Sequence, residues 1–562
     1  MPLQFFGFNP NSISSSLMRS RFHPLQATGV LVILSLLAAL LAWPVVSIWS
    51  SWLHWDAQRF DMLWEMVRTV LPDYALTSLL LCILVGLGVA LLGLFSAALV
   101  TLCDFPGRRW LEWALLLPLA MPAYVVAYAY TDFFQFSGPL QIALRENLGL
   151  QGALWPDIRN VWGAGLIFSL TLYPYVYLLV RTALMENVSS LMDAARLLGA
   201  GFGRRVRTVA LPLARPAVAA GVALALMETL ADFGVSSYFG VQSFTAGIYK
   251  TWLVMDDRIA SAQLATLLLA TVLILLFWER KNQQKARFAS SRASGAFDSG
   301  AGLKVEGAFG YLLLGLGLLP VLLGFVLPLG ILLWLWAAEP ATVAWASFIQ
   351  WGINSLRLGL ITALLAVLIA LVLAALCRQS SSVWPRVLTQ ILGLGYAIPG
   401  AVVVVGVLLP LGWLQGTTLG NGISFWVTAT SLGLIWAYLV RFCAVALQSV
   451  QSGYARIPAS MDESSRTLGV TGLSLFGRLH LPLLRRSSLA ALMLVFVDVM
   501  KELPATLVLR PFNSDTLAVV AYQLARDERL GEAALPSLAL VLFGLIPVIL
   551  VSQGLRQGRL AR

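Results

Sequence analysis

The chain has 562 residues, of which 59% are apolar and only 12% are charged, with a formal net charge of +11. Because a soluble globular domain usually carries about a quarter of charged residues, this composition excludes a soluble multidomain enzyme, a disordered chain and a collagen-like fibre. The apolar residues form long unbroken runs, which differ from the short alternating segments typical of a membrane β-barrel. The sequence therefore predicts an all-α integral membrane protein in a lipid bilayer.

About twelve apolar runs are long enough to cross the membrane as helices, which takes about 20 residues each. The first run is too long for the apolar core of a signal peptide, so we expect it to be retained. The runs fall into two sets of six. The expected spans lie near residues 30–49, 75–102, 111–134, 162–184, 213–236 and 262–279, and then near 308–337, 352–376, 386–413, 424–447, 486–509 and 535–555.

The segment 280–307, which separates the two sets, is rich in Lys, Arg, Ser, Gly and Ala and has few large apolar residues. Such a composition buries too little apolar surface to fold, so a flexible cytoplasmic linker is expected. The predicted organisation is a cytoplasmic N-terminal segment at 1–28, a six-helix domain at 29–279, the linker, and a second six-helix domain at 308–562.

Arginine and lysine residues gather in alternate loops, while most of the remaining loops are mixed or acidic. The positive-inside rule then places both termini in the cytoplasm, with the protein spanning the membrane several times. The family resemblance given below implies that this membrane is the inner membrane of a bacterium. Only the loop at 510–532, which is basic and acidic in similar measure, weakens this assignment. Orientation thus accounts for the basic excess without a nucleic-acid partner. The four cysteines form no CxxC pair, which argues against a disulfide framework or a thiolate metal site.

Short motifs recur between the two sets of spans. Residues 196–199 read RLLG and residues 466–469 read RTLG, a shift of 270, and we also match Val-Arg at 180–181 with Val-Arg at 440–441. Composition alone does not readily produce matched Arg and Gly in hydrophilic loops. The repeat predicts two duplicated halves of equal orientation, related by an axis along the membrane normal, with a pathway between them.

Two hydrophilic loops, one in each half, carry the same spacing of acidic, small, glycine and proline residues. Asp193 opens a short segment that reaches Gly199, and Glu463 opens one that reaches Gly469. An acidic residue suits a helix N-terminus, glycine lets the chain turn, and proline fits the first turn of the next helix. A structured basic loop that occurs twice predicts a docking surface for a two-fold partner. Its expected residues are Asp193, Ala194, Ala195, Gly199, Leu211, Pro212, Glu463, Ser464, Ser465, Gly469, Leu481 and Pro482.

This spacing resembles the EAA loop of the membrane subunits of ABC importers, which reads E-A-A, three residues, G, nine residues and I-x-L-P. The resemblance implies a fused pair of type I permease domains whose loops each bind one subunit of a cytoplasmic ATPase homodimer. The loops depart from the pattern at Asp193, Ser464 and Ser465, which suggests that the two ATPase contacts are not equivalent. None of the five lysines follows a glycine, as a phosphate-binding loop requires. We therefore expect a non-enzymatic transport subunit without a permanently bound cofactor, with ATP used by the partner.

Four carboxylates interrupt apolar spans as two pairs spaced i, i+4, so that each pair is expected to share a helix face. The shift of 270 relates Glu228 to Asp498 and Asp232 to Glu502. Carboxylates at such depth tend to face water-filled cavities. We expect all four to line the translocation path near its outer mouth and to ligate a hard cation transiently. Alternatively, Lys501 pairs with a neighbour and the outer two acids lie among lipid headgroups.

The stretches ETLADFGVSSYFG at 228–240 and KELPATLVLRPF at 501–512, and the tail at 517–547, resemble the ferric-iron branch of ABC permeases. This resemblance implies alternating access and a periplasmic binding protein that delivers Fe(III). A permease for thiamine or for another cation or polyamine is the alternative, and a secondary transporter is a weaker one. Soft-metal transport is disfavoured because neither Cys nor His clusters in the sequence.

Overall fold

The computed structural model describes residues 24–53, 57–187, 189–290, 303–338, 344–379, 383–414 and 417–560. Within these ranges the chain is helical apart from loops and one pair of two-residue strands. The predicted N-terminal segment 1–28 lies mostly outside the described residues, as does the middle of the predicted linker, 291–302. The fold is the all-α membrane architecture that the composition predicts.

The first half begins with a long helix and ends with another. Its elements are α1 (Pro24–Trp49), η2 (Ser50–Leu53), α2 (Ala57–Thr69), α3 (Leu71–Leu102), β1 (Cys103–Asp104), α4 (Arg108–Ala114), η3 (Leu117–Ala120), α5 (Ala123–Phe134), α6 (Pro139–Leu148), α7 (Val161–Asn187), α8 (Ser189–Leu197), α9 (Phe202–Arg205), η4 (Val206–Ala210), α10 (Leu211–Ala231), α11 (Gly234–Tyr238), α12 (Phe244–Leu253) and α13 (Arg258–Ser290).

The second half repeats this order of elements. It contains β2 (Leu303–Lys304), α14 (Ala308–Val321), η5 (Leu322–Val326), α15 (Leu327–Ala338), α16 (Trp345–Gln379), α17 (Trp384–Leu392), η7 (Gly395–Ala397), α18 (Gly400–Leu414), α19 (Thr418–Ala429), α20 (Leu432–Tyr454), α21 (Ala459–Thr467), α22 (Gly472–Leu475), η8 (Phe476–His480), α23 (Leu481–Lys501), α24 (Pro504–Leu509), α25 (Leu517–Arg526) and α26 (Leu530–Leu560). The π-turns η4 and η8 occupy matching positions at the shift of 270.

Among the described residues, nine helices are long and apolar enough to cross a membrane, or up to eleven if each of two bent pairs counts as one span. The bends, of 88° and 114°, fall in the expected spans 111–134 and 386–413, where α4–η3 meets α5 and α17–η7 meets α18. The remaining expected span is α23, which carries Arg485, Arg486, Asp498 and Lys501 and is therefore less apolar than the others. The expected start of the span at 424–447 was wrong, because α19 is a separate helix and α20 begins at Leu432.

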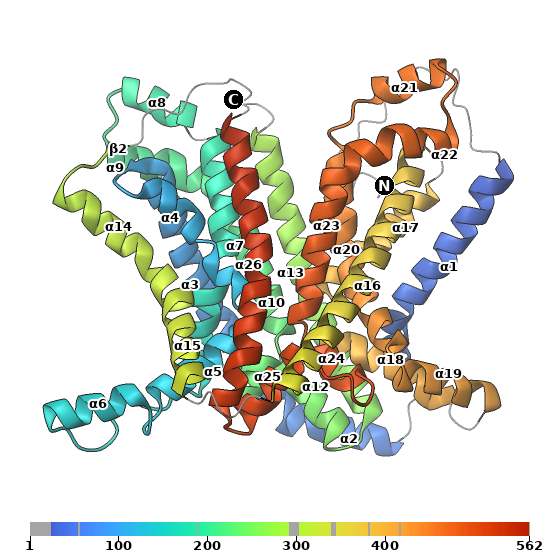
Figure 1. Ribbon diagram of the computed structural model, residues 1–562, viewed down its shortest axis with the longest axis horizontal. Coiled ribbons are helices and arrows are strands. Elements are labelled where there is room, and N and C mark those ends of the chain that lie inside the picture. The colour runs from blue at the N-terminus through green and yellow to red at the C-terminus, as the bar shows by residue number, and fades with distance from the viewer. Residues whose placement is uncertain are drawn as a thin grey trace.

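The helices form a bundle with two ends of different character (Figure 1). The short helices α8 and α9 of the first half and α21 and α22 of the second lie at one end, which we call the loop face. The elements α6, α12, α19 and α25 lie at the other end, which we call the opposite face. Because the two predicted docking loops emerge at the same end, one partner can reach both.

The first helix of each half packs against the other half. Trp436 of α20 donates its Nε1–H to the Leu40 carbonyl of α1 at 3.0 Å. Ser47 of α1 donates to the Gly406 carbonyl of α18 at 2.7 Å. A Cβ at Gly406 would lie 2.0 Å from the Pro44 carbonyl oxygen, so only glycine allows this approach. Conversely, Tyr130 of α5 donates to the Leu323 carbonyl of η5. Division of the chain at 280–307 therefore does not divide the molecule in space.

Both ends of the predicted linker are regular in structure. Helix α13 continues to Ser290, and β2 pairs in parallel with β1, with Cys103 opposite Leu303 and Asp104 opposite Lys304. The amide of Val305 donates to the Asp104 carbonyl at 2.8 Å. The composition of this segment predicts a flexible linker over 280–307. Its first part instead extends helix α13, and its last part forms strand β2 paired with β1.

Candidate translocation path and docking loops

Each predicted docking loop is a short helix that ends at a glycine in the left-handed backbone region. Gly199 has φ of 78° after α8, and Gly469 has φ of 76° after α21. The amides of Gly199 and Gly469 donate to the carbonyls of Arg196 and Arg466 at 3.0 Å. Nothing lies within 4 Å of a Cβ built on either glycine, so the sign of φ, rather than crowding, selects glycine here.

The ends of both loop helices present large apolar side chains. Leu197 and Leu198 are 89% and 88% exposed, and Leu468 is 82% exposed. Apolar side chains this exposed at the tip of a loop indicate a surface that another protein covers. Of the other predicted docking residues, Ala194, Glu463, Ser464, Leu481 and Pro482 are exposed, and Ala195, Ser465, Leu211 and Pro212 are half-buried, while the side chain of Asp193 lies outside the described residues.

The outer two carboxylates of the predicted path terminate helices. Helix α10 ends at Ala231 and α23 ends at Lys501, so that Asp232 and Glu502 occupy the extended residue that follows. The backbone leaves the helical path after each of these acids, whose φ angles of −72° and −69° are still helical. Asp232 accepts from the amide of Val235 at 2.8 Å and caps the start of α11.

Glu502 caps α24 in the same way but carries an additional ion pair. Its carboxylate accepts from the amides of Ala505 and Thr506, each at 3.0 Å, and from the Thr506 hydroxyl at 2.7 Å. The guanidinium of Arg441 on α20 donates to the same carboxylate at 2.8 Å. The Glu502 side chain is only 1% exposed. A buried carboxylate with this many donors is structurally engaged.

The inner two carboxylates, Glu228 and Asp498, interact electrostatically with each other. Asp498 interacts with Glu228, Lys501 and Arg441. Glu228 lines a small cavity, where it accepts from the hydroxyl of Tyr396 at 2.8 Å. The cavity lies where α7, α10, η7 and α20 meet and is lined by Tyr175, Leu224, Met227, Glu228, Ala231, Tyr396, Ala397 and Arg441. Polar groups from both halves thus converge between them.

Lys501 of the second half forms a hydrogen bond to the first half. Its ammonium donates to the carbonyl of Leu119 in η3 at 2.9 Å. This contact bears out the expectation that Lys501 pairs with a neighbour, although the main partner is a main-chain carbonyl of the other half. The broken element η3 exposes that carbonyl because its 3₁₀ turn leaves acceptors without a partner in the helix.

The predicted ring of four carboxylates is not assembled in this conformation. Asp232 and Glu502 are held as caps, and among the described residues Glu228 is the one of the four acids that lines the cavity. Within the residues that the structure describes, no group of three or more His, Cys, Asp and Glu side chains is arranged to hold a metal ion. The expected four-residue cation site fails because the helices end one residue before the outer acids.

The cavity also contains residues that sequence reasoning missed, namely Tyr175, Tyr396 and Arg441. Arg441 could have been found, since an arginine inside an apolar span is a sign of function by default. The repeat presents Arg441 only as the partner of Arg181, and this match assigned it no role in the path. Arg181 instead pairs with Glu112 of α4 at 3.3 Å. Arg181 lies eight residues before α8 and Arg441 lies eighteen before α21, so the two occupy different depths.

Contacts between the halves continue at the opposite face. The hydroxyl of Tyr522 on α25 is 2.8 Å from the hydroxyl of Ser237 on α11. Tyr249 of α12 donates to the Pro504 carbonyl of α24 at 2.6 Å, and the Phe233 ring packs against the rings of both tyrosines. The segments just beyond the cavity are therefore closed against one another across the boundary between the halves.

Comparison with known proteins finds one family model that matches part of the chain and relatives that match most of it. Residues 89–287 match the model of the binding-protein-dependent transport system inner membrane component. The chain is 25% identical over 503 residues to the Fe(3+)-transport system permease protein FbpB 2 of Haemophilus influenzae, covering 87% of this chain and 91% of the relative. It is 24% identical over 528 residues to the ferric transport system permease protein FbpB of Actinobacillus pleuropneumoniae, covering 89% and 74%.

A shorter and more similar match is found to a smaller protein. The molybdenum transport system permease protein ModB of Escherichia coli is 34% identical over 148 residues, which are 26% of this chain and 62% of the relative. The family match, the full-length similarity to the two ferric permeases and the membrane-helix fold agree with one another. Together they support an ABC permease of the ferric family with several membrane spans.

Proposed function

We propose that this permease moves Fe(III) from a periplasmic binding protein into the cytoplasm. The observation that carries the proposal is the similarity to two ferric permeases, which extends over 87% and 89% of the chain and so includes both halves. The loop face is then cytoplasmic, with both termini on that side, and the opposite face receives the binding protein. Transport proceeds by alternating access of the cavity between the halves.

A cytoplasmic ATPase homodimer would drive the transport by binding the two docking loops. Support comes from their common end of the molecule, their matched glycine turns and their exposed leucines (Figure 1). Each loop leads through a π-turn directly into α10 or α23, the helices that carry Glu228 and Asp498. Because this connection is continuous, movement of a loop reaches the cavity along one helix. The ATP is used by the partner, and the permease itself carries no catalytic residues.

The path in this proposal runs past Glu228 and Asp498. These two acids come from the two halves and interact electrostatically, and Glu228 accepts from the hydroxyl of Tyr396 in the cavity. Carboxylate and phenol oxygens suit a hard trivalent cation, and such a cation would interact with them in passing. Asp232 and Glu502 have a different part, since they hold α11 and α24 in place at the outer end of the path.

Reconstitution tests this assignment. The permease would be purified with its ATPase, placed in proteoliposomes, and supplied with the binding protein loaded with Fe(III). We expect ATP-dependent uptake of iron, and Glu228→Gln combined with Asp498→Asn should lower the rate by at least about tenfold. Uptake of thiamine without uptake of iron would overturn the substrate, and uptake that needs an ion gradient but no ATP would overturn the class.

An oxyanion is a second candidate substrate. The similarity to the molybdenum permease, and the cationic groups of Arg441 and Lys501 near the cavity, favour it. However, that similarity covers 26% of the chain against 87% for the ferric relative. Molybdate and sulfate in the same uptake assay distinguish the candidates, since the ferric proposal predicts no ATP-dependent uptake of either.

A further inference from the structure

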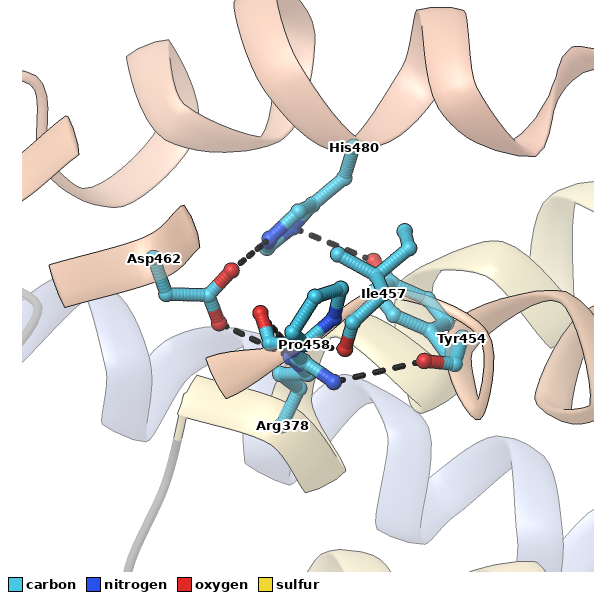
Figure 2. A network of polar contacts seen from close by, with 6 residues as sticks. All are labelled: Arg378, Tyr454, Ile457, Pro458, Asp462 and His480. Atoms are coloured by element: carbon cyan, nitrogen blue, oxygen red, sulfur yellow. Dashed lines mark hydrogen bonds and ion pairs between the residues drawn. The ribbon is translucent and has the colours of Figure 1, made fainter. Parts of the chain in front are cut away.

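The loop helix α21 is held to the membrane helices by a buried polar network (Figure 2). Asp462, which is 6% exposed, accepts from Nε of Arg378 at 2.8 Å and from Nε2 of His480 at 3.0 Å. His480 is fully buried. Burial acts to raise the pKa of the Asp462 carboxyl, but the hydrogen bonds from Arg378 and His480 outweigh burial and hold this pKa below its usual value.

The other polar atoms of the network are also engaged. With the proton of His480 on Nε2, its Nδ1 accepts from the hydroxyl of Tyr454 at 3.3 Å. Hydrogen bonds that join in one buried network strengthen one another and fix a single arrangement. The two terminal nitrogens of Arg378 donate to three main-chain carbonyls, those of Tyr454, Ile457 and Pro458, at 3.3, 2.9 and 3.2 Å.

This network joins four elements at one point. Arg378 lies at the end of α16, Tyr454 at the end of α20, and Asp462 on α21, while His480 is the last residue of the π-turn η8. Helix α23 begins at the next residue and carries Asp498, which is about 27 Å farther along at 1.5 Å per residue. The loop helix is thus tied to the base of the helix that reaches the cavity.

The first loop cannot form this network. The shift of 270 relates Asp462 to Met192 and His480 to Ala210, and neither of these side chains ionises. Both are buried, at 7% and 2% exposure, so apolar packing holds α8 to the base of α10. Among the described side chains, Arg205 adds one long hydrogen bond, to the Met192 carbonyl at 3.5 Å. Apolar contacts are non-directional and allow sliding, whereas a network of charged hydrogen bonds does not.

We propose that Arg378, Asp462 and His480 are positioning residues that transmit movement of the second loop to α23, so that the second loop is coupled more tightly than the first. This inference rests on the proposed function, because it takes the two loops to be the ATPase contacts. The two loops then differ in the buried residues that anchor each loop helix to the membrane helices. None of these three residues needs to touch the ATPase.

The test is Asp462→Asn in the full complex in proteoliposomes, with Fe(III) transported per ATP hydrolysed as the readout. We expect this ratio to fall about fivefold while ATP hydrolysis continues, a typical size for a lost coupling between sites. The matched control is Asp104→Asn, which makes the same change in a more exposed pair with Arg108, outside both docking loops. An unchanged ratio in Asp462→Asn would overturn the inference, as would an equal fall in the control.

Two further variants separate positioning from folding. His480→Gln keeps an amide donor toward Asp462 and should retain most of the ratio, whereas His480→Ala should lose it. The double variant Asp462→Asn with His480→Ala should lose no more than either change alone, because the residues act as one unit. A fall in the ratio that matches a fall in the amount of assembled complex would show a structural role only, and additive losses would contradict a single unit.

Hydrogen exchange tests the link without any substrate. We expect backbone amides of α21 to exchange at least about tenfold more slowly than those of α8, and Asp462→Asn to remove the difference. Equal exchange of the two helices in the unaltered protein would overturn the link. If the unaltered complex moves no iron, the proposed function fails, while this measurement still decides whether the link exists.

Discussion

The two docking loops have nearly the same backbone and different attachments. Both consist of a short helix, a glycine at positive φ, a second short helix and a π-turn that leads into a long membrane helix. Beneath the first loop lie Met192 and Ala210, and beneath the second lie Asp462 and His480. The shape of a loop can therefore be kept while the stiffness of its connection changes, because glycine and helix ends set the shape and buried side chains set the connection.

The same contrast is found at the far ends of α10 and α23. Asp232 and Glu502 follow equivalent helices and cap equivalent short helices, but among the described residues only Glu502 has an ion-pair partner, which is Arg441. In both comparisons the second half uses a buried charge network where the first half uses simpler contacts. At these two places the second half is therefore the more rigidly specified one.

The largest expected effect is at Glu502. Replacing it by alanine leaves Arg441 buried without its partner, which should lower the free energy of unfolding by about 3–5 kcal/mol. The equivalent change, Asp232→Ala, removes only a helix cap and should cost about 1 kcal/mol. Thermal unfolding of both variants in the same detergent compares them. Equal losses would mean that the halves do not differ at this level.

The next effect concerns the loop glycines. Gly199→Val and Gly469→Val each force a β-branched residue into the left-handed region, at a cost of about 1–2 kcal/mol. Both variants should lower the amount of iron taken up per ATP hydrolysed. The larger decrease is expected for Gly469→Val, because the anchored helix α21 cannot shift to relieve the strain. Uptake per ATP in proteoliposomes measures this. A larger decrease for Gly199→Val than for Gly469→Val would contradict the comparison, as would no decrease in either variant.

A smaller effect is expected at the exposed leucines. Leu197→Asp and Leu468→Asp place a charge where the proposed ATPase contact is apolar, and each should weaken ATPase binding by roughly tenfold. Binding of the ATPase to the detergent-solubilised permease gives the constants. Because both side chains are more than four-fifths exposed, folding should be unchanged, and unaltered binding in both variants would argue against the loops as the contact.

The smallest effect is a pH dependence confined to the second loop. The pKa of Asp462 is lowered from 3.8, so its contribution to stability is complete above that value and is lost as pH falls through the lowered pKa. Hydrogen exchange of α21, corrected for the intrinsic effect of pH, should stay constant from neutral pH to about 4 and rise only below it. In Asp462→Asn the exchange rate of α21 should show no such rise. The exchange rate of α8 should show none in the same pH range in the unaltered protein.

The sequence by itself determined the membrane class, the position of most long apolar segments, the two loops and their glycine turns. These features depend on local chemistry, namely on the apolar length that crosses a bilayer and on the preference of glycine for positive φ. The spacing around Gly199 and Gly469 was therefore sufficient to predict a helix and a turn, both of which are present. The expected start of each helix at its acidic residue was wrong, because α8 begins at Ser189 and α21 at Ala459, four residues before Asp193 and Glu463.

Only the tertiary structure decided where the charges act. Helices α10 and α23 end one residue before Asp232 and Glu502, so these acids became caps and the four-carboxylate site did not form. Arg441, Tyr175 and Tyr396 reached the cavity from helices distant in the sequence. The first helices crossed to the opposite halves. A periodic pattern gives the face of a helix but not its neighbours, and a buried charge takes its role from its neighbours.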